Sequence, residues 1–102
     1  MNLNVAKCLL VSKVLVADGI MTENERIFLD KLMKKLGLDE KERQGVIDLE
    51  GWDEAEGVVA NLSVDEKREL VSTLVDASSA DGRLSPLEMQ TVKRISAALG
   101  VD

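Results

Sequence analysis

Residues 16–39 read VADGIMTENERIFLDKLMKKLGLD, and residues 79–102 read SADGRLSPLEMQTVKRISAALGVD. The two stretches align without gaps. Each contains Ala-Asp-Gly, then a Thr or Ser, then a Glu, and finally Leu-Gly, all at the same spacing. Apolar character is also kept between these positions, as at Met21 and Leu84. This internal repeat decides the fold, because each of its parts has a mechanical role at a helix end.

Each copy of the repeat describes a helix–loop–helix hairpin. After the incoming helix, the Asp-Gly pair lets the chain turn, since glycine readily takes a left-handed conformation. The Thr or Ser caps the next helix, and the Glu bonds back to the cap in the reciprocal pattern of a capping box. Gly37 and Gly100 end that helix, each before an apolar residue typical of a Schellman motif. We expect the two hairpins to pack together around a pseudo-twofold axis, because neither can bury both faces alone.

Capping pairs also place the remaining helices. A short polar residue with Glu three positions later occurs at Thr22, Asp39, Asp53, Ser63 and Ser85. Together with the apolar N-terminal segment, these pairs predict about six helices, at residues 3–17, 23–36, 40–50, 54–61, 64–79 and 86–99. The first is apolar on nearly all sides, which is typical of a central buried helix. The sequence therefore predicts one all-α domain over residues 1–102, with the two pseudo-symmetric hairpins packed in a compact bundle.

The composition restricts the classes of function. The chain has 102 residues, 45% apolar and 31% charged, and is large enough to bury a core without metals or disulfides. Its net charge of −6 argues against binding to nucleic acid or anionic membranes, which needs clustered cations. Lys31, Lys34 and Lys35 form a local basic patch, interpreted as a solvated helix face. With no signal peptide, no apolar stretch that could span a bilayer and a single Cys, we expect a cytoplasmic protein without direct membrane insertion.

The residues do not indicate catalysis. The chain has no His, which excludes Ser-His-Asp and Cys-His arrangements. Cys8 lies on the most apolar helix and is interpreted as a core residue. The glycines are scattered at helix ends and do not form a phosphate-binding loop. We therefore expect a protein that is not an enzyme and has no certain cofactor.

Trp52 lies between two short predicted helices and is the only tryptophan. We interpret it as a core or hinge anchor, with an exposed binding anchor as the alternative. The alternative makes Trp52 the candidate interaction residue.

The doubled pattern Ala-Asp-Gly-x-apolar-Thr/Ser-x-x-Glu resembles the TerB-like family, which comprises stand-alone tellurite-resistance proteins and the central region of DjlA-type membrane co-chaperones. A J domain is excluded, because its His-Pro-Asp signature needs a His. The resemblance implies an all-helical bundle in the bacterial cytoplasm, with a role in resistance to tellurite or another stress. It also implies that the acidic loop residues are candidates for metal binding. The residues that carry it are Ala17-Asp18-Gly19, Thr22 and Glu25, then Ala80-Asp81-Gly82, Ser85 and Glu88.

The two loops also match the second half of an EF-hand calcium loop. Such a loop needs oxygen ligands at its first and third positions. Those positions hold Val14 and Val16 in the first copy, and Ala77 and Ser79 in the second. The sequence therefore excludes a standard EF-hand.

A weaker metal site shared by the two loops is left open. Asp18, Glu25, Asp81 and Glu88 would supply four carboxylates if the loops lie side by side. Oxygen ligands favour Ca²⁺, Mg²⁺ or Mn²⁺ over zinc. The alternative is structural: the two Asp form turns and the two Glu cap helices.

Two classes of function follow from the sequence. The first is a non-enzymatic protein-interaction module whose acidic surface meets a basic partner protein or, as a homodimer, a second copy of the chain. The alternative is a metal-responsive domain in which a hard divalent cation at the Asp-Gly loops alters helix packing.

Overall fold

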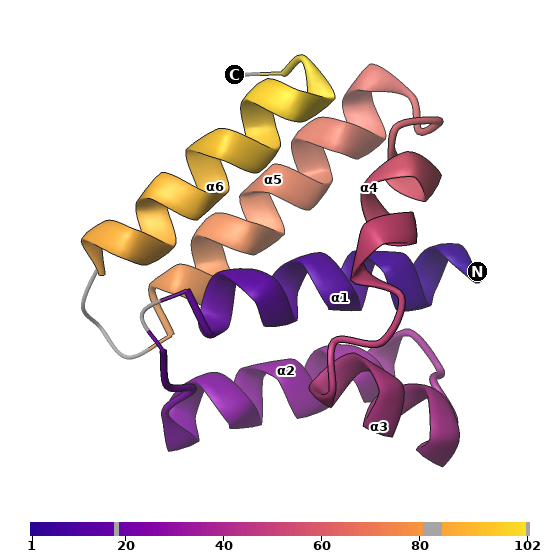
Figure 1. Ribbon diagram of the computed structural model, residues 1–102, viewed down its shortest axis with the longest axis vertical. Coiled ribbons are helices and arrows are strands. Elements are labelled where there is room, and N and C mark those ends of the chain that lie inside the picture. The colour runs from indigo at the N-terminus through magenta and orange to yellow at the C-terminus, as the bar shows by residue number, and fades with distance from the viewer. Residues whose placement is uncertain (18, 81–84, 102) are drawn as a thin grey trace.

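The computed structural model describes residues 1–17, 19–80 and 85–101 of the chain. Within them the protein is all-helical, as predicted, and Figure 1 shows the helices packed into one bundle. No helix in this part of the chain is long and apolar enough to cross a membrane. The helices are α1 (Leu3–Leu15), α2 (Glu23–Lys35), α3 (Glu40–Ile47), α4 (Trp52–Val59), α5 (Val64–Ser78) and α6 (Pro86–Leu99).

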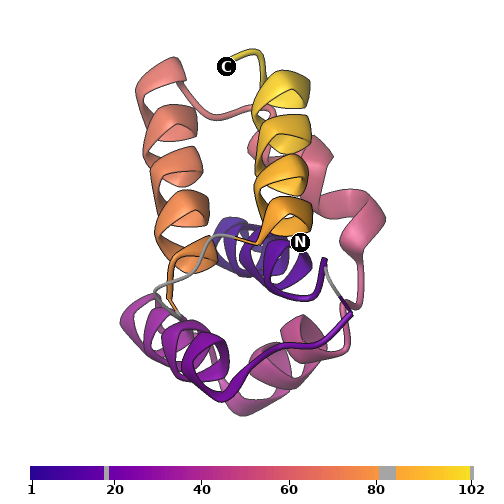
Figure 2. The same cartoon turned by 90° about the vertical axis from the view of Figure 1, so that its left-hand side faces the viewer.

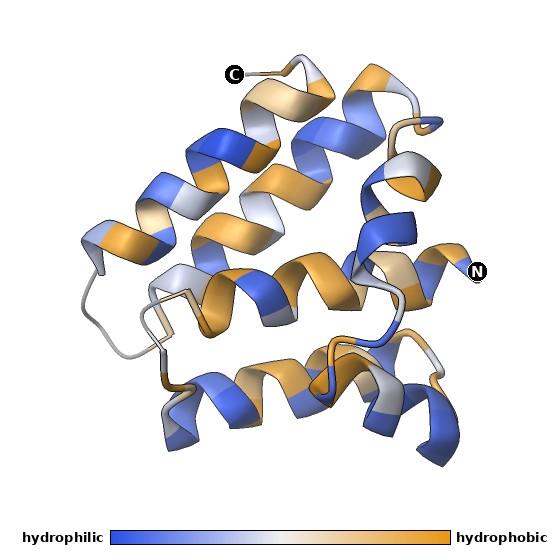
Figure 3. Ribbon diagram, in the orientation of Figure 1, coloured by the Kyte–Doolittle hydropathy of each residue, from blue (hydrophilic) through white to orange (hydrophobic). Residues whose placement is uncertain are grey.

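Helix α1 is the centre of the bundle and contacts all the other helices. Figure 2 shows α5 and α6 on one side of it, α2 and α3 on the opposite side, and α4 along its flank. Figure 3 shows apolar residues along nearly the whole of α1. Because no side of such a helix favours water, burial on every side is its stable state. Its fully buried residues are Ala6, Cys8, Leu9, Leu10, Val11, Ser12, Val14 and Leu15.

The two repeat copies form the two predicted hairpins. In both views α1 lies antiparallel beside α2, and α5 lies antiparallel beside α6 (Figures 1 and 2). The end of α1, the start of α2, the end of α5 and the start of α6 all lie on one side of the molecule. Met21 packs against the core just before the α2 cap, as the repeat predicts. Its counterpart Leu84 lies outside the described residues.

Two helix ends use the predicted glycines. Gly37 has a φ of 77° and Gly100 a φ of 75°, both left-handed. The amide of Leu38 donates to the Met33 carbonyl at 3.0 Å, and the amide of Val101 donates to the Ser96 carbonyl at 3.1 Å. These are the long hydrogen bonds of a Schellman motif. The prediction for both helix ends is confirmed.

The connection between α3 and α4 differs from the prediction. Helix α3 ends at Ile47 and not at residue 50, because Leu49 takes a left-handed φ of 56° and the Glu50 amide bonds back to the Gly45 carbonyl at 2.8 Å. Helix α4 begins at Trp52 after Gly51, whose φ is 76°. The predicted capping box from Asp53 to Glu56 is therefore wrong, since Asp53 already lies in the first helical turn.

Glycine substitutions test these conformations. Gly57 lies inside α4, and a methyl group added there would meet no described atom within 4 Å. We expect Gly57→Ala to raise the free energy of unfolding by about 0.5–1 kcal/mol, because alanine favours a helix interior. Gly37→Ala, the control, should lower it by about 1 kcal/mol, since a φ of 77° is strained for alanine. Urea denaturation measures both, and a change of the same sign in the two variants would contradict the assigned conformations.

Candidate functional site

The two glutamates of the predicted metal site lie at the starts of α2 and α6. Their exposed fractions are only 2% for Glu25 and 3% for Glu88. Glu25 Oε1 accepts a hydrogen bond from the Thr22 amide at 2.9 Å, and Thr22 Oγ1 accepts one from the Glu25 amide at 3.2 Å. The Ser85 hydroxyl accepts from the Glu88 amide at 3.4 Å. The Thr22–Glu25 contacts form a complete capping box, so the structural interpretation explains the placement of Glu25. At the start of α6, the Ser85 side chain caps the helix through the Glu88 amide.

The aspartates of the same predicted site, Asp18 and Asp81, lie outside the described residues. Over residues 1–17, 19–80 and 85–101, no group of three acidic or Cys side chains is gathered so that it could hold a metal ion. The structure thus describes two of the four candidate carboxylates, and the four-carboxylate site stays a prediction.

Trp52 is the first residue of α4 and packs half-buried against the core. The Lys13 ammonium lies 5.4 Å from the centroid of its ring, which is cation–π range. Because Lys13 belongs to α1, the pair ties the start of α4 to the central helix. This placement fits the hinge-anchor interpretation. The role of Trp52 as an interaction residue stays a prediction.

Cys8 lies in the interior of α1 with no exposed surface. Loss of solvation by burial raises the pKa of its thiol to about 12, and the positive charge of Lys7 lowers it only partly. A thiol with such a pKa is protonated at neutral pH and is a poor nucleophile or metal ligand. The interpretation of Cys8 as a core residue fits this environment.

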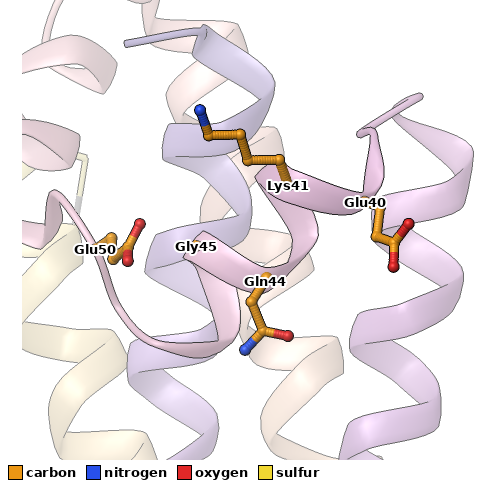
Figure 4. A pocket seen from close by; sticks show the side chains of 5 residues that line it. All are labelled: Glu40, Lys41, Gln44, Gly45 and Glu50. Carbon is orange, nitrogen blue, oxygen red and sulfur yellow. The ribbon is translucent and has the colours of Figure 1, made fainter.

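A hollow of about 560 Å³ lies beside α3, lined by Glu40, Lys41, Gln44, Gly45 and Glu50. Figure 4 shows that its side chains do not converge on a common point. Glu40 and Glu50 lie on opposite sides of α3, and Lys41 extends away from Glu40. A cation needs several oxygen ligands around one position. The hollow therefore has no cation-site geometry.

A different surface, not predicted from the sequence, lies between α2 and α5. Two adjoining hollows of about 300 and 170 Å³ share Leu32, Lys35 and Thr73 in their linings. We call their combined surface the α2–α5 groove. Its apolar part is made by half-buried residues of α2 packed on the core and by buried residues of α5 and α1. The apolar lining residues are Phe28, Leu32, Leu36, Leu70 and Val11.

The groove has walls of opposite charge. Lys31 and Lys35 stand on α2, with Lys7 of α1 beside them. The opposite wall on α5 carries Glu66, Glu69 and Asp76. No ion pair joins the two walls in the described part of the chain, where the ion pair found is Arg26–Asp30 within α2. The groove therefore combines apolar side chains with charges that have no counter-ion across it.

Two sequence features, an apolar stripe and a basic patch on the second predicted helix, contribute residues to this groove. The apolar stripe of the second predicted helix includes Phe28, Leu29, Leu32 and Leu36. The structure buries Leu29 completely but leaves the other three half-buried. Lys31 and Lys35 of the basic patch line the groove, whereas Lys34 lines another hollow, between α2 and α3.

Comparison with known proteins assigns the chain to a family. The family model described as "Tellurite resistance protein TerB" matches residues 4–102 of the chain. No curated protein and no solved structure shows significant similarity to it. The family match covers all six helices except the first residue of α1.

The cap roles of Thr22 and Glu25 can be tested by stability. We expect Thr22→Ala and Glu25→Ala each to lower the free energy of unfolding by about 1 kcal/mol, because each removes one bond of the capping box. Glu25→Gln should lose less, since glutamine also serves in this position. Glu23→Ala, in the same helical turn but outside the box, is the control and should change it by less than about 0.5 kcal/mol. Equal losses at Glu23 and Glu25 in urea denaturation would contradict the cap role.

Proposed function

The chain belongs to the TerB family of tellurite resistance proteins, and on that basis we propose that it is a non-enzymatic protein-interaction module serving resistance to tellurite or a related stress. The observation that carries the interaction role is the α2–α5 groove. Protein interfaces typically combine an apolar centre with a polar and charged rim. The groove has both, with Leu32 and Phe28 between charged walls.

Several features support a binding role over catalysis. The chain has no His to act as a general base near neutral pH. The thiol of Cys8 is buried and protonated. The Glu25 carboxylate is engaged by the backbone of its own cap. The Cys8 thiol and the Glu25 carboxylate thus each have a structural role in the fold, which favours a module that acts by contact.

The net charge of the chain supports a protein as its partner, and the single cysteine supports the cytoplasm as its compartment. A net charge of −6 disfavours nucleic acid and anionic membranes and favours a partner protein with basic groups. The single Cys8 forms no disulfide within the chain, and a free thiol suits the reducing cytoplasm.

A tellurite survival assay tests this function. In cells lacking the gene for this chain, we expect lower tolerance of potassium tellurite, restored by the wild type. Thr73→Arg should fail to restore it, because the larger side chain fills the groove from the α5 wall. The control is Thr91→Arg on α6: like Thr73, Thr91 bonds to the carbonyl four residues earlier, but it lies outside the groove.

The outcomes separate the parts of the proposal. Unchanged tellurite tolerance on deletion of the gene would contradict the stress role. Full restoration by Thr73→Arg would contradict the role of the groove. Circular dichroism melts of both variants establish that the fold is intact.

A metal-responsive domain is the second candidate function. It is favoured by the placement of the hairpin ends, since the starts of α2 and α6 lie on one side of the molecule with Glu25 and Glu88 buried there. In this proposal Asp18 and Asp81 join the two glutamates in holding Ca²⁺, Mg²⁺ or Mn²⁺. Ion binding would then couple the two hairpins.

Calorimetric titration of each ion tests the metal function. If the function holds, the wild type should release or absorb heat at ion concentrations below the millimolar range and melt at a higher temperature when the ion is present. Asp18→Asn/Asp81→Asn should abolish both effects. Absence of heat and of a melting shift at millimolar ion in the wild type would remove the metal function and leave the interaction module.

A further inference from the structure

We propose that the α2–α5 groove binds an amphipathic helix of a partner protein, whose apolar stripe is flanked by acidic side chains on one side and basic side chains on the other. The inference rests on the proposed interaction function and specifies the partner's chemistry. The shape of the groove, the spacing of its apolar residues and the charges of its walls all fit such a helix.

The apolar residues of the groove are spaced for a helix. Phe28, Leu32 and Leu36 follow one another at four-residue intervals and form a row about 12 Å long on α2 and its C-cap residue. Leu70 of α5 and Val11 of α1 line the groove with them. A partner helix presents apolar residues three or four positions apart, which gives a row with the same repeat. The two rows can therefore interdigitate over two to three helical turns.

The size of the two hollows suits the side chains of a protein partner better than a small-molecule ligand. Its two hollows measure about 170 and 300 Å³ and are open to the surface. Sites for small molecules usually enclose their ligand in about 300–1,000 Å³. Each hollow taken alone is at or below the lower end of that range, and neither encloses a ligand. They suit apolar side chains inserted from a helix that lies across the surface.

The charges of the walls specify the flanks of that helix. Lys31 and Lys35 on α2 would attract acidic side chains on the near flank of the partner helix. Glu69 and Asp76 on α5 would attract Lys or Arg on its other flank. The described part of the chain provides no counter-ion for them across the groove. Because reversing the helix direction would exchange its flanks, the two walls also fix the direction in which it binds.

A second copy of this chain is a poorer occupant. Two copies would each carry a net charge of −6 and repel one another. A twofold axis parallel to the groove would bring α2 of one copy opposite α5 of the other, which satisfies the charges. However, it would set two recessed surfaces face to face, so that the apolar rows could not insert into each other. A convex helix from another protein fits the recess better.

A designed peptide tests the proposal directly. The probe is a synthetic, fluorescently labelled helix about 14 residues long, with Leu every three or four positions, Glu along one flank and Lys along the other. A scrambled peptide of the same composition lacks the stripe and is the control. In fluorescence anisotropy with the full chain, we expect saturable binding of the first peptide and at least about tenfold weaker binding of the second.

Charge reversal on one wall is the sharper test. The double variant Lys31→Glu/Lys35→Glu should bind the Glu/Lys peptide about tenfold more weakly than the wild type does. Because both walls are then acidic, it should bind a peptide with Lys on both flanks about as tightly as the wild type binds the Glu/Lys peptide. The control is Lys34→Glu, an exposed lysine on the same helix that lines another hollow. It should leave the affinities for both peptides unchanged. High salt should reduce the effect of the double variant.

Three results would overturn the proposal. They are equal binding of the striped and scrambled peptides, equal effects of Lys34→Glu and the double variant, and a stable dimer in sedimentation that excludes the peptide. Failure of peptide binding with the tellurite phenotype intact would overturn this inference alone. Intact peptide binding without a tellurite phenotype would overturn the stress role alone.

Discussion

The need to bury α1 on every side is the constraint on which the rest of the structure depends. A helix with apolar residues around its whole circumference cannot lie on a surface. It needs neighbours in all directions, and the five other helices all contact it. The two hairpins supply α2, α5 and α6, while the short helix α3 lies beside α2 and the short helix α4 covers the flank. Each fully buried Leu or Val of α1 contributes roughly 1.5–3 kcal/mol, so loss of any one neighbour would expose a costly apolar surface.

Local chemistry made most of the fold predictable from the sequence. The caps at Thr22, Asp39, Ser63 and Ser85 depend only on residues within one helical turn, and all four are present. The end of α3 was not predictable in this way, because a leucine, Leu49, takes the left-handed position that usually belongs to glycine. Its side chain packs against the core, so tertiary contacts fix a conformation that its own preference disfavours.

The candidate surface was less predictable than the fold, for a related reason. The apolar stripe of α2 indicates which side of the helix faces the protein, but not which of its residues a neighbour covers. Leu29 is covered completely, whereas Leu32 and Phe28 border α5 and are only half-buried. The acidic wall of the groove comes from a helix far away in the sequence. Its charges face those of Lys31 and Lys35 because both helices pack on α1 and contact each other.

The residues of the groove and those of the repeat differ in how far folding alone explains them. Thr22 and Ser85 occupy the same position in the two copies and cap their helices, and the Glu25 side chain completes the capping box of α2. In the aligned copies, Phe28 corresponds to Thr91 and Lys35 to Ala98, so these two groove residues of α2 have no equivalents on α6. The other three keep their character, because Lys31, Leu32 and Leu36 correspond to Arg94, Ile95 and Leu99. Nor is the groove a contact within one hairpin, since its walls are α2 of the first and α5 of the second. Capping therefore accounts for Thr22 and Ser85, whereas Phe28 and Lys35 are particular to the first copy and meet α5 only in the folded chain.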